Sequence, residues 1–301
     1  MAQELNLMKR LTIDEIINHS LKIYGKNFLF FILILAIPFV PAYIFLALFA
    51  QKLMLAMGII SANAESMGME GVMQILRSLG QYSVGMLVYC VLLVFAIAAM
   101  VKAASDVITQ TQTSIGGVLN HVLSLFFPIL LTSIIAAVIV VLGFPFCMVP
   151  SLILAIYLTF IIQAVVIEDR RYFRAVGRSF QFVKGHFGSI FLLMFIYWIL
   201  YSMISSAVTW GFMMGPYIDL FKDMIRNGGQ TDPAVMTALY AKISKIMVPV
   251  YAFDGVLNIL LYPLLLTAIT LKFHNVRNLK EGTGLIDEIN LRQNAPNASG
   301  K

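Results

Sequence analysis

Residues 172–187 read YFRAVGRSFQFVKGHF and lie between two long apolar segments of the chain. The apolar side chains of this stretch recur at steps of three and four residues, which places them on one face of a helix: Phe173, Val176, Phe180, Val183 and Phe187. Basic residues lie off that face or just before it: Arg170, Arg171, Arg174, Arg178 and Lys184. A basic amphipathic helix between two membrane spans is expected to lie on the membrane surface, where it would contact lipid head groups.

The composition of the whole chain indicates a membrane protein. Of its 301 residues, 60% are hydrophobic and 12% are charged, and the mean hydropathy is +0.87. A soluble domain carries about 25% charged residues. The net charge of +6 would suggest nucleic acid if the basic residues gathered on a soluble face, but here they lie beside apolar runs. We therefore expect the phospholipid bilayer, and no nucleic acid, as their partner.

Six apolar runs are long enough to cross a bilayer as helices, at about 20 residues per span. They cover about 28–49, 82–101, 123–143, 148–167, 188–211 and 248–271. The third and fourth runs belong to a stretch, 107–167, without Asp, Glu, Lys or Arg, and Pro145 and Pro150 mark the turn between them. The predicted fold is an all-α integral membrane protein with one six-helix membrane domain over 1–280. Residues 281–301 are predicted to be a disordered cytoplasmic tail.

The orientation of the spans follows from the positions of Lys and Arg. Two polar segments, 51–80 and 215–246, separate spans on one side of the membrane, and Asn63, Gly68 and Gly71 interrupt any regular pattern in the first. The opposite side carries more Lys and Arg, close to the ends of the spans. Because cytoplasmic segments carry the excess of these residues, both termini are predicted to be cytoplasmic, in the cytoplasmic (inner) membrane.

Three segments that each precede an odd-numbered span are similar to one another, at about 12–26, 114–122 and 171–186. All three show apolar residues at helical steps, and the first begins with the capping-box pattern Thr12-Ile13-Asp14-Glu15. One interpretation is a three-unit internal repeat, in which each unit is an amphipathic cytoplasmic interfacial helix followed by a span. The alternative is that any cytoplasmic segment entering a membrane is amphipathic and basic.

Two stretches resemble a known family. Residues 11–28, LTIDEIINHSLKIYGKNF, and residues 165–187, VVIEDRRYFRAVGRSFQFVKGHF, resemble the prokaryotic glycerophosphoryl diester phosphodiesterase membrane-domain family. The resemblance implies a six-helix membrane domain of poorly defined function. The phosphodiesterase activity in the family name belongs to a separate soluble domain, and about twenty polar residues after the last span leave no room for one. We therefore do not expect phosphodiesterase activity.

Polar residues within the spans are the candidates for chemistry. Asp254 and Asn258 are spaced i, i+4 in the last span, so both face one way, and an ionisable group inside a span is a functional candidate. Asp254 is expected less than two turns from the outer end, where water reaches it. Four prolines are candidate helix kinks: Pro38, Pro41, Pro249 and Pro263. Glu168 and Asp169 are expected to cap the basic helix and to form ion pairs.

Neither a catalytic constellation nor a metal or cofactor motif emerges from these residues, which argues against an intramembrane enzyme. The hypothesis is a non-enzymatic polytopic membrane protein that transports or gates a small or lipid-like solute. The alternative is a membrane scaffold or regulator that binds anionic lipid or a protein partner through a basic cytoplasmic collar. The collar consists of Arg170, Arg171, Arg174, Arg178 and Lys184. The pattern specifies neither a protein partner nor a homo-oligomer.

Overall fold

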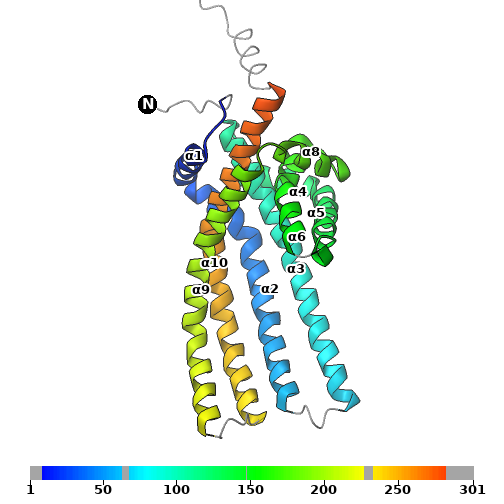
Figure 1. Ribbon diagram of the computed structural model, residues 1–301, viewed down its shortest axis with the longest axis vertical. Helices are drawn as coiled ribbons and strands as arrows, with labels where there is room; N and C mark the ends of the chain where they lie inside the picture. The colour runs from blue at the N-terminus through cyan, green and yellow to red at the C-terminus, as the bar shows by residue number, and fades with distance from the viewer. Residues whose placement is uncertain (1–8, 63–67, 147, 227–232, 283–301) are drawn as a thin grey trace, which may run out of the picture. The chain divides into compact units, whose positions relative to one another are not determined.

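The computed structural model describes residues 9–62, 68–146, 148–226 and 233–282. Within these ranges the regular structure is entirely helical (Figure 1), which confirms the all-α prediction. The helices are α1 Ile13–Lys26, α2 Phe28–Ala62, α3 Met69–Ile108, α4 Ile115–Ser124, α5 Phe126–Val141, η2 Phe144–Phe146, α6 Met148–Tyr157, α7 Ile161–Glu168, α8 Phe173–Val183, α9 Phe187–Arg226 and α10 Pro233–Glu281.

Five helical segments are long and apolar enough to cross a membrane, and the bent pair α4–α5 makes a sixth if it is one span. The five are Phe28–Gly58, Met69–Ile108, Met148–Glu168, Phe187–Arg226 and Ala234–Glu281. A multi-pass membrane architecture follows from these lengths and compositions. The predicted tail begins at Glu281, which is the last residue of α10, and is described as far as Gly282. The rest of the tail lies outside the described residues, and so does Asn63.

Four helices are longer than predicted. α2, α3, α9 and α10 contain 35, 40, 40 and 49 residues, so most of 51–80 and 215–246 is helical. The interruption expected in 51–80 is wrong at Gly71, which lies within α3. At 1.5 Å per residue, 40 residues extend about 60 Å, about twice the hydrocarbon thickness of a bilayer. The helices therefore continue well beyond the apolar runs that define the predicted spans.

Packing explains why the polar segments stay helical. Leu239, Ile243 and Met247 of α10 form a buried cluster with partly buried residues of α2 and α9, among them Met54 and Met213. Tertiary contacts of this kind stabilise helices whose intrinsic propensity is modest. The apolar residues of these segments recur at helical spacing even though polar residues separate them.

The chain forms two compact units, whereas the sequence predicts one membrane domain over 1–280. Unit 1 comprises 1–34, 97–196 and 263–301, and unit 2 comprises 35–96 and 197–262. Helices α2, α3, α9 and α10 each contribute residues to both units. The two units are described in turn.

In unit 1, the predicted capping box begins α1. The Glu15 N–H donates to Thr12 Oγ1 at 3.5 Å, and the Thr12 N–H donates to Glu15 Oε2 at 2.8 Å. The segment before the helix is fastened to α10, because the Asn275 side chain accepts from the Leu11 N–H at 3.3 Å and donates to the Lys9 carbonyl at 2.8 Å. These bonds fix residues 9–11 against the end of α10.

Helix breaks lie within the third and fourth predicted spans. α4 and α5 meet at 65° around Leu125, and α5 contains 16 residues, about 24 Å of helix. The segment 148–167 is interrupted between α6 and α7, which pack with α5 and α8 to form the group of short helices drawn in green in Figure 1. The span predicted at 148–167 corresponds to the candidate span Met148–Glu168, whose helix breaks after Tyr157, and the span predicted at 123–143 corresponds mainly to α5 of the bent pair.

Ser179 of α8 closes the break between α6 and α7. Its hydroxyl donates to the Tyr157 carbonyl at 2.6 Å and accepts from the Phe160 N–H at 3.1 Å, and its side chain is fully buried. A helix break inside a protein leaves backbone groups unpaired unless a side chain reaches them. Ser179 supplies both partners.

Replacing Ser179 by alanine is expected to lower the stability by about 1–3 kcal/mol, because both backbone groups lose their partner in a buried place. Thermal or denaturant unfolding of the detergent-purified protein measures this loss. Ser124→Ala is the matched control, since the Ser124 hydroxyl is exposed and donates only to a carbonyl of its own helix. Equal effects of the two substitutions would contradict the role given to Ser179.

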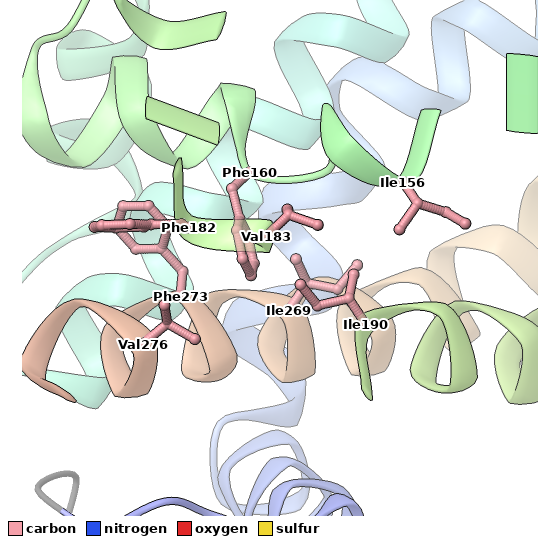
Figure 2. Packing of buried hydrophobic residues seen from close by; sticks show 8 residues of the cluster. All are labelled: Ile156, Phe160, Phe182, Val183, Ile190, Ile269, Phe273 and Val276. Carbon is pink, nitrogen blue, oxygen red and sulfur yellow. The ribbon is translucent and has the colours of Figure 1, made fainter. Parts of the chain in front are cut away.

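The core of unit 1 gathers side chains from α6 to α10 (Figure 2): Ile156, Phe160, Phe182, Val183, Ile190, Ile269, Phe273 and Val276. Phe273 contacts two other rings of the cluster, with ring centroids 5.5 Å from Phe160 and 5.2 Å from Phe182. The first turn of α9 and the 269–276 segment of α10 are therefore packed against α8.

The buried face of α8 differs from the predicted apolar stripe. Its buried residues are Ala175, Arg178, Ser179, Phe182 and Val183, whereas Phe173 of the stripe is 73% exposed. The buried guanidinium of Arg178 and the buried hydroxyl of Ser179 both have bonding partners in unit 1. Polar residues can therefore occupy the face of α8 that packs against the rest of the unit. The three similar segments of the sequence each form a helix, namely α1, α4 and α8. That these helices belong to an internal repeat stays a prediction.

In unit 2, the helices adjoin in the order α9, α10, α2 and α3 (Figure 1). The ring contacts that establish this order are Tyr197–Tyr262, Phe39–Tyr262 and Tyr43–Tyr89. Gly85 permits the close approach of α3 to α2, because a Cβ atom there would lie 2.3 Å from the ring of Phe49.

Candidate functional site

The polar residues predicted in the last span lie together in unit 2. Asn258 Nδ2 lies 2.8 Å from the Asp254 carbonyl, as the i, i+4 spacing predicts, and Ser205 of α9 donates its hydroxyl to Asp254 Oδ1 at 2.7 Å. Among residues 9–62, 68–146, 148–226 and 233–282, no Lys, Arg or His forms an ion pair with Asp254. The site is thus a half-buried carboxylate with a hydroxyl donor and no neutralising cation.

Asn258 connects three helices to this carboxylate. Its amide nitrogen lies 2.9 Å from the hydroxyls of both Tyr43 and Tyr201, and the Tyr89 hydroxyl lies 3.4 Å from that of Tyr43. An amide nitrogen has two protons, so it cannot donate at once to both hydroxyls and to the Asp254 carbonyl. The amide donates to the Asp254 carbonyl, because with the amide turned over its oxygen would face that carbonyl oxygen, and two acceptors cannot bond.

Aromatic rings surround this network. Five ring pairs with centroids 5.5 to 6.1 Å apart follow one another: Tyr89–Tyr43, Tyr43–Phe39, Phe39–Tyr262, Tyr262–Tyr197 and Tyr197–Tyr201. The chain of rings begins and ends at tyrosines whose hydroxyls belong to the polar network or adjoin it. We call the side chains of Ser205, Asp254, Asn258, Tyr43, Tyr89 and Tyr201 the polar cluster.

An apolar groove of about 280 Å³ lies between α2 and α10 in the same unit. Its wall includes Phe39, Tyr43, Ile44, Ala252, Gly255 and Val256. Tyr43 belongs to both features, because its ring faces the groove and its hydroxyl faces Asn258. The ring lies against Gly255, where a Cβ atom would be only 3.0 Å from Tyr43 Cγ. Tyr43 is therefore the partition between the groove and the polar cluster.

The helix that carries Asp254 extends well beyond the predicted span. α10 begins at Pro233, about six turns before Asp254, whereas the predicted span begins at about residue 248. The position of Asp254 less than two turns from the outer end of that span stays a prediction.

Sequence reasoning missed the tyrosines of the polar cluster. Tyr201 and Ser205 are spaced i, i+4 on α9, the same spacing as Asp254 and Asn258 on α10. Polar pairs with the same spacing on two adjoining helices can face one another, and this pattern could have indicated Tyr201. Tyr43 and Tyr89 carry no comparable signal. The four predicted kinks, Pro38, Pro41, Pro249 and Pro263, all lie within α2 or α10, and bending at them stays a prediction.

Four of the five basic collar residues are exposed in unit 1, namely Arg170, Arg171, Arg174 and Lys184. Asp169 pairs with Arg171 at 2.9 Å, and Glu168 pairs with Arg170 at 3.2 Å, so the expected ion pairs are present. The expected capping role is wrong, because Tyr172 occupies the N-cap of α8 with no side-chain cap bond.

Arg178 is the exception to the predicted basic surface. Its side chain is 7% exposed and pairs with Glu168 at 2.6 Å and with Glu281 at 2.5 Å, so lipid head groups cannot reach it. The guanidinium also lies 4.0 Å from the ring centroid of Phe182. The sequence predicted an exposed Arg178 because its two ion-pair partners, Glu168 and Glu281, are ten and about a hundred residues away in the chain.

The histidines of unit 1 occupy different environments. His274 Nε2 lies 3.0 Å from the Ser105 hydroxyl, and His121 Nε2 lies 3.3 Å from the Val166 carbonyl. His186 Nδ1 is buried without a hydrogen-bond partner in the described part of the chain. Burial, and then the charges of Lys272, Lys280 and Arg10, lower the pKa of His186 to about 4.

The lowered pKa of His186 predicts a pH-dependent stability. An unfolded imidazole has a pKa of about 6.5, so as the pH falls the unfolded chain takes up this proton before the folded chain does. The contribution of His186 is fully present above about pH 6.5 and is lost as the pH falls towards about 4. His186→Gln should flatten this part of the pH profile of the melting temperature, and unchanged slopes would contradict the prediction.

No family model, no curated protein and no solved structure matches the chain.

Proposed function

We propose that this protein is a multi-pass protein of the cytoplasmic membrane that moves or gates a small or lipid-like solute without catalysing a reaction. The observation that carries the proposal is the Asp254 carboxylate, which has the Ser205 hydroxyl as donor and no paired cation among the described residues. An unpaired ionisable group in an apolar helix is costly, and such groups mark substrate or ion pathways. The polar cluster is the proposed site for the charged or polar part of the solute.

The groove between α2 and α10 supports the lipid-like character of the solute. It offers an apolar surface separated from the polar cluster by one side chain, that of Tyr43. A change of Tyr43 rotamer would join an apolar and a polar surface in unit 2. The resemblance to the prokaryotic glycerophosphoryl diester phosphodiesterase membrane-domain family and the cytoplasmic location of both termini belong to the same proposal.

Flux in proteoliposomes tests this function with two probes, the organic cation tetraphenylphosphonium and a fluorescent short-chain phosphatidylcholine. Asp254→Asn keeps the size of the side chain and removes its charge, and it should reduce the flux of at least one probe about tenfold or more. Ser205→Ala should reduce the same flux by a smaller factor. Ser206→Ala is the matched control, because the neighbouring Ser206 hydroxyl bonds only to a carbonyl of its own helix.

Two results would overturn the proposed function. One is flux of both probes at the rate of empty liposomes. The other is equal flux of the wild type, Asp254→Asn and Ser206→Ala variants, which would separate transport from the polar cluster.

A second candidate, a scaffold or regulator that binds anionic lipid, is favoured by the exposed cations at the start of α8. Arg170, Arg171 and Arg174 line an open concavity of about 630 Å³ in unit 1. Reversing all three to glutamate should lower the amount of anionic lipid that is purified with the protein, whereas Asp254→Asn should leave it unchanged. The opposite pattern would exclude this role.

A further inference from the structure

Three basic side chains of unit 1, those of Arg10, His186 and Lys272, have no ion-pair partner among the described residues. Lys272 of α10 is 1% exposed, and no carboxylate in the described ranges pairs with it. Burial of an ammonium without a partner disfavours its charged form. A bound anion would stabilise charged Lys272 by supplying the counter-charge that no described carboxylate supplies.

Two other basic groups are brought to the same place by packing. The Asn275 side chain holds the backbone of Lys9 and Leu11, so Arg10 lies between two fixed residues beside the 272–275 turn of α10. Val183 and Ile190 pack against Ile269, Phe273 and Val276 (Figure 2), so the connection between α8 and α9, which carries His186, lies along the same segment of α10.

The three groups differ in ways that suit one anion. Arg10 is exposed and can approach from the water with a planar pair of donors. Lys272 supplies a point charge in the interior, and His186 has a buried Nδ1 without a partner in the described part of the chain, which can donate its proton. The charges of Lys272 and Arg10 also act on His186, in agreement with their closeness.

We propose that Arg10, Lys272 and His186 form a binding site for one phosphate-type anion in unit 1. The ligand is either a free phosphate or phosphate ester, or the phosphate of an anionic phospholipid, because both present the same tetrahedral group of oxygens. The site differs from the exposed collar of Arg170, Arg171 and Arg174, and it is independent of the polar cluster of unit 2.

The first arm of the test uses inorganic phosphate and the full-length protein in a neutral detergent. Phosphate should raise the melting temperature in a saturable way, beyond potassium chloride at equal ionic strength, because a ligand that binds the folded state stabilises it. Arg10→Gln should shift the midpoint of this effect about tenfold to higher phosphate, the cost of one charged hydrogen-bonded contact. Lys272→Gln should abolish the saturable part.

The second arm uses nanodiscs that contain phosphatidylglycerol or only phosphatidylcholine. It measures the number of phosphatidylglycerol molecules retained by each protein after extraction, and Arg10→Gln and Lys272→Gln should each lower this number. Lys22→Gln is the matched control in both arms, because Lys22 is an exposed cation of α1 in the same unit. Arg10→Gln alters an exposed residue and keeps the test valid if Lys272→Gln fails to fold.

The outcomes separate the two sources of the anion. A phosphate effect in detergent that Arg10→Gln weakens assigns the site to a free phosphate or phosphate ester. Specific loss of retained phosphatidylglycerol without an effect of phosphate assigns it to the lipid head group. The proposal is overturned if Arg10→Gln and Lys272→Gln behave as Lys22→Gln does in both arms, since the charges would then act only through the general potential.

Discussion

Replacing Arg178 by leucine should lower the free energy of unfolding by about 3–5 kcal/mol, the cost of removing one partner from a buried ion pair. Arg178 bonds to both oxygens of Glu168, at 2.6 and 2.8 Å, and to Glu281 at 2.5 Å. The substitution leaves the carboxylate of Glu168, 10% exposed, with the exposed Arg170 as its one remaining ion-pair partner among the described residues. The expected destabilisation comes from leaving the Glu168 carboxylate buried without its main counter-charge. It therefore exceeds the net contribution of the intact ion pair to stability.

The charge of Arg178 is secure in the folded protein. Burial by itself would lower the pKa of its guanidinium, and the hydrogen bonds to Glu168 and Glu281 more than offset this, so that the pKa is raised. Two carboxylates thus make a buried arginine possible on the packing face of α8. They also join three elements of unit 1, because Glu168 ends α7 and Glu281 ends α10.

Denaturant unfolding of Arg178→Leu beside Arg174→Leu measures the effect. Arg174 is exposed on the same helix and has no ion-pair partner in the described part of the chain, so its substitution should change the stability by about 0.5 kcal/mol or less. The double variant Arg178→Leu, Glu168→Gln should recover part of the loss, because it removes the stranded charge. Similar losses for the two arginines would refute a structural role for the buried pair.

The sequence allowed the fold class to be predicted because hydrophobic runs of span length are a strong and local signal. It predicted the start of α1 through the capping box, but it did not predict where the long helices α2, α3 and α9 end. The α10 segment around Leu239 and Ile243 contains Lys242 and Lys245, which lower its mean hydropathy, yet its apolar residues recur at helical steps and pack on α2 and α9. Mean hydropathy indicates which part of a helix is apolar enough to cross a membrane. The helical spacing of apolar residues indicates how far the helix itself extends.

The candidate site shows the same limit. The i, i+4 spacing placed Asp254 and Asn258 on one face, because that relation lies within one helix. Tyr43, Tyr89 and Tyr201 come from three other helices, and only the tertiary arrangement brings their hydroxyls towards Asn258. Arg178 was misplaced for the same reason, since whether an arginine is outside depends on carboxylates distant in the sequence.

Phe273→Ala should lower the free energy of unfolding by about 3–5 kcal/mol, as deletions of buried aromatic rings do. The side chain is fully buried and contacts the rings of both Phe160 and Phe182. Truncation removes these contacts and leaves a cavity between α10, α8 and the break after α6, where the bonds of Ser179 limit any collapse. Thermal or denaturant unfolding in detergent measures the loss.

Phe173→Ala is the control, because it deletes the same ring from a side chain that is 73% exposed. Its expected effect on unfolding in detergent is about 0.5 kcal/mol or less. The pair also decides between two descriptions of α8. If the predicted stripe through Phe173 were the face that holds the helix to the protein, Phe173→Ala would be the more damaging change. If Ala175, Arg178, Ser179 and Phe182 form that face, Phe273→Ala is the more damaging, because Phe273 is what Phe182 packs against.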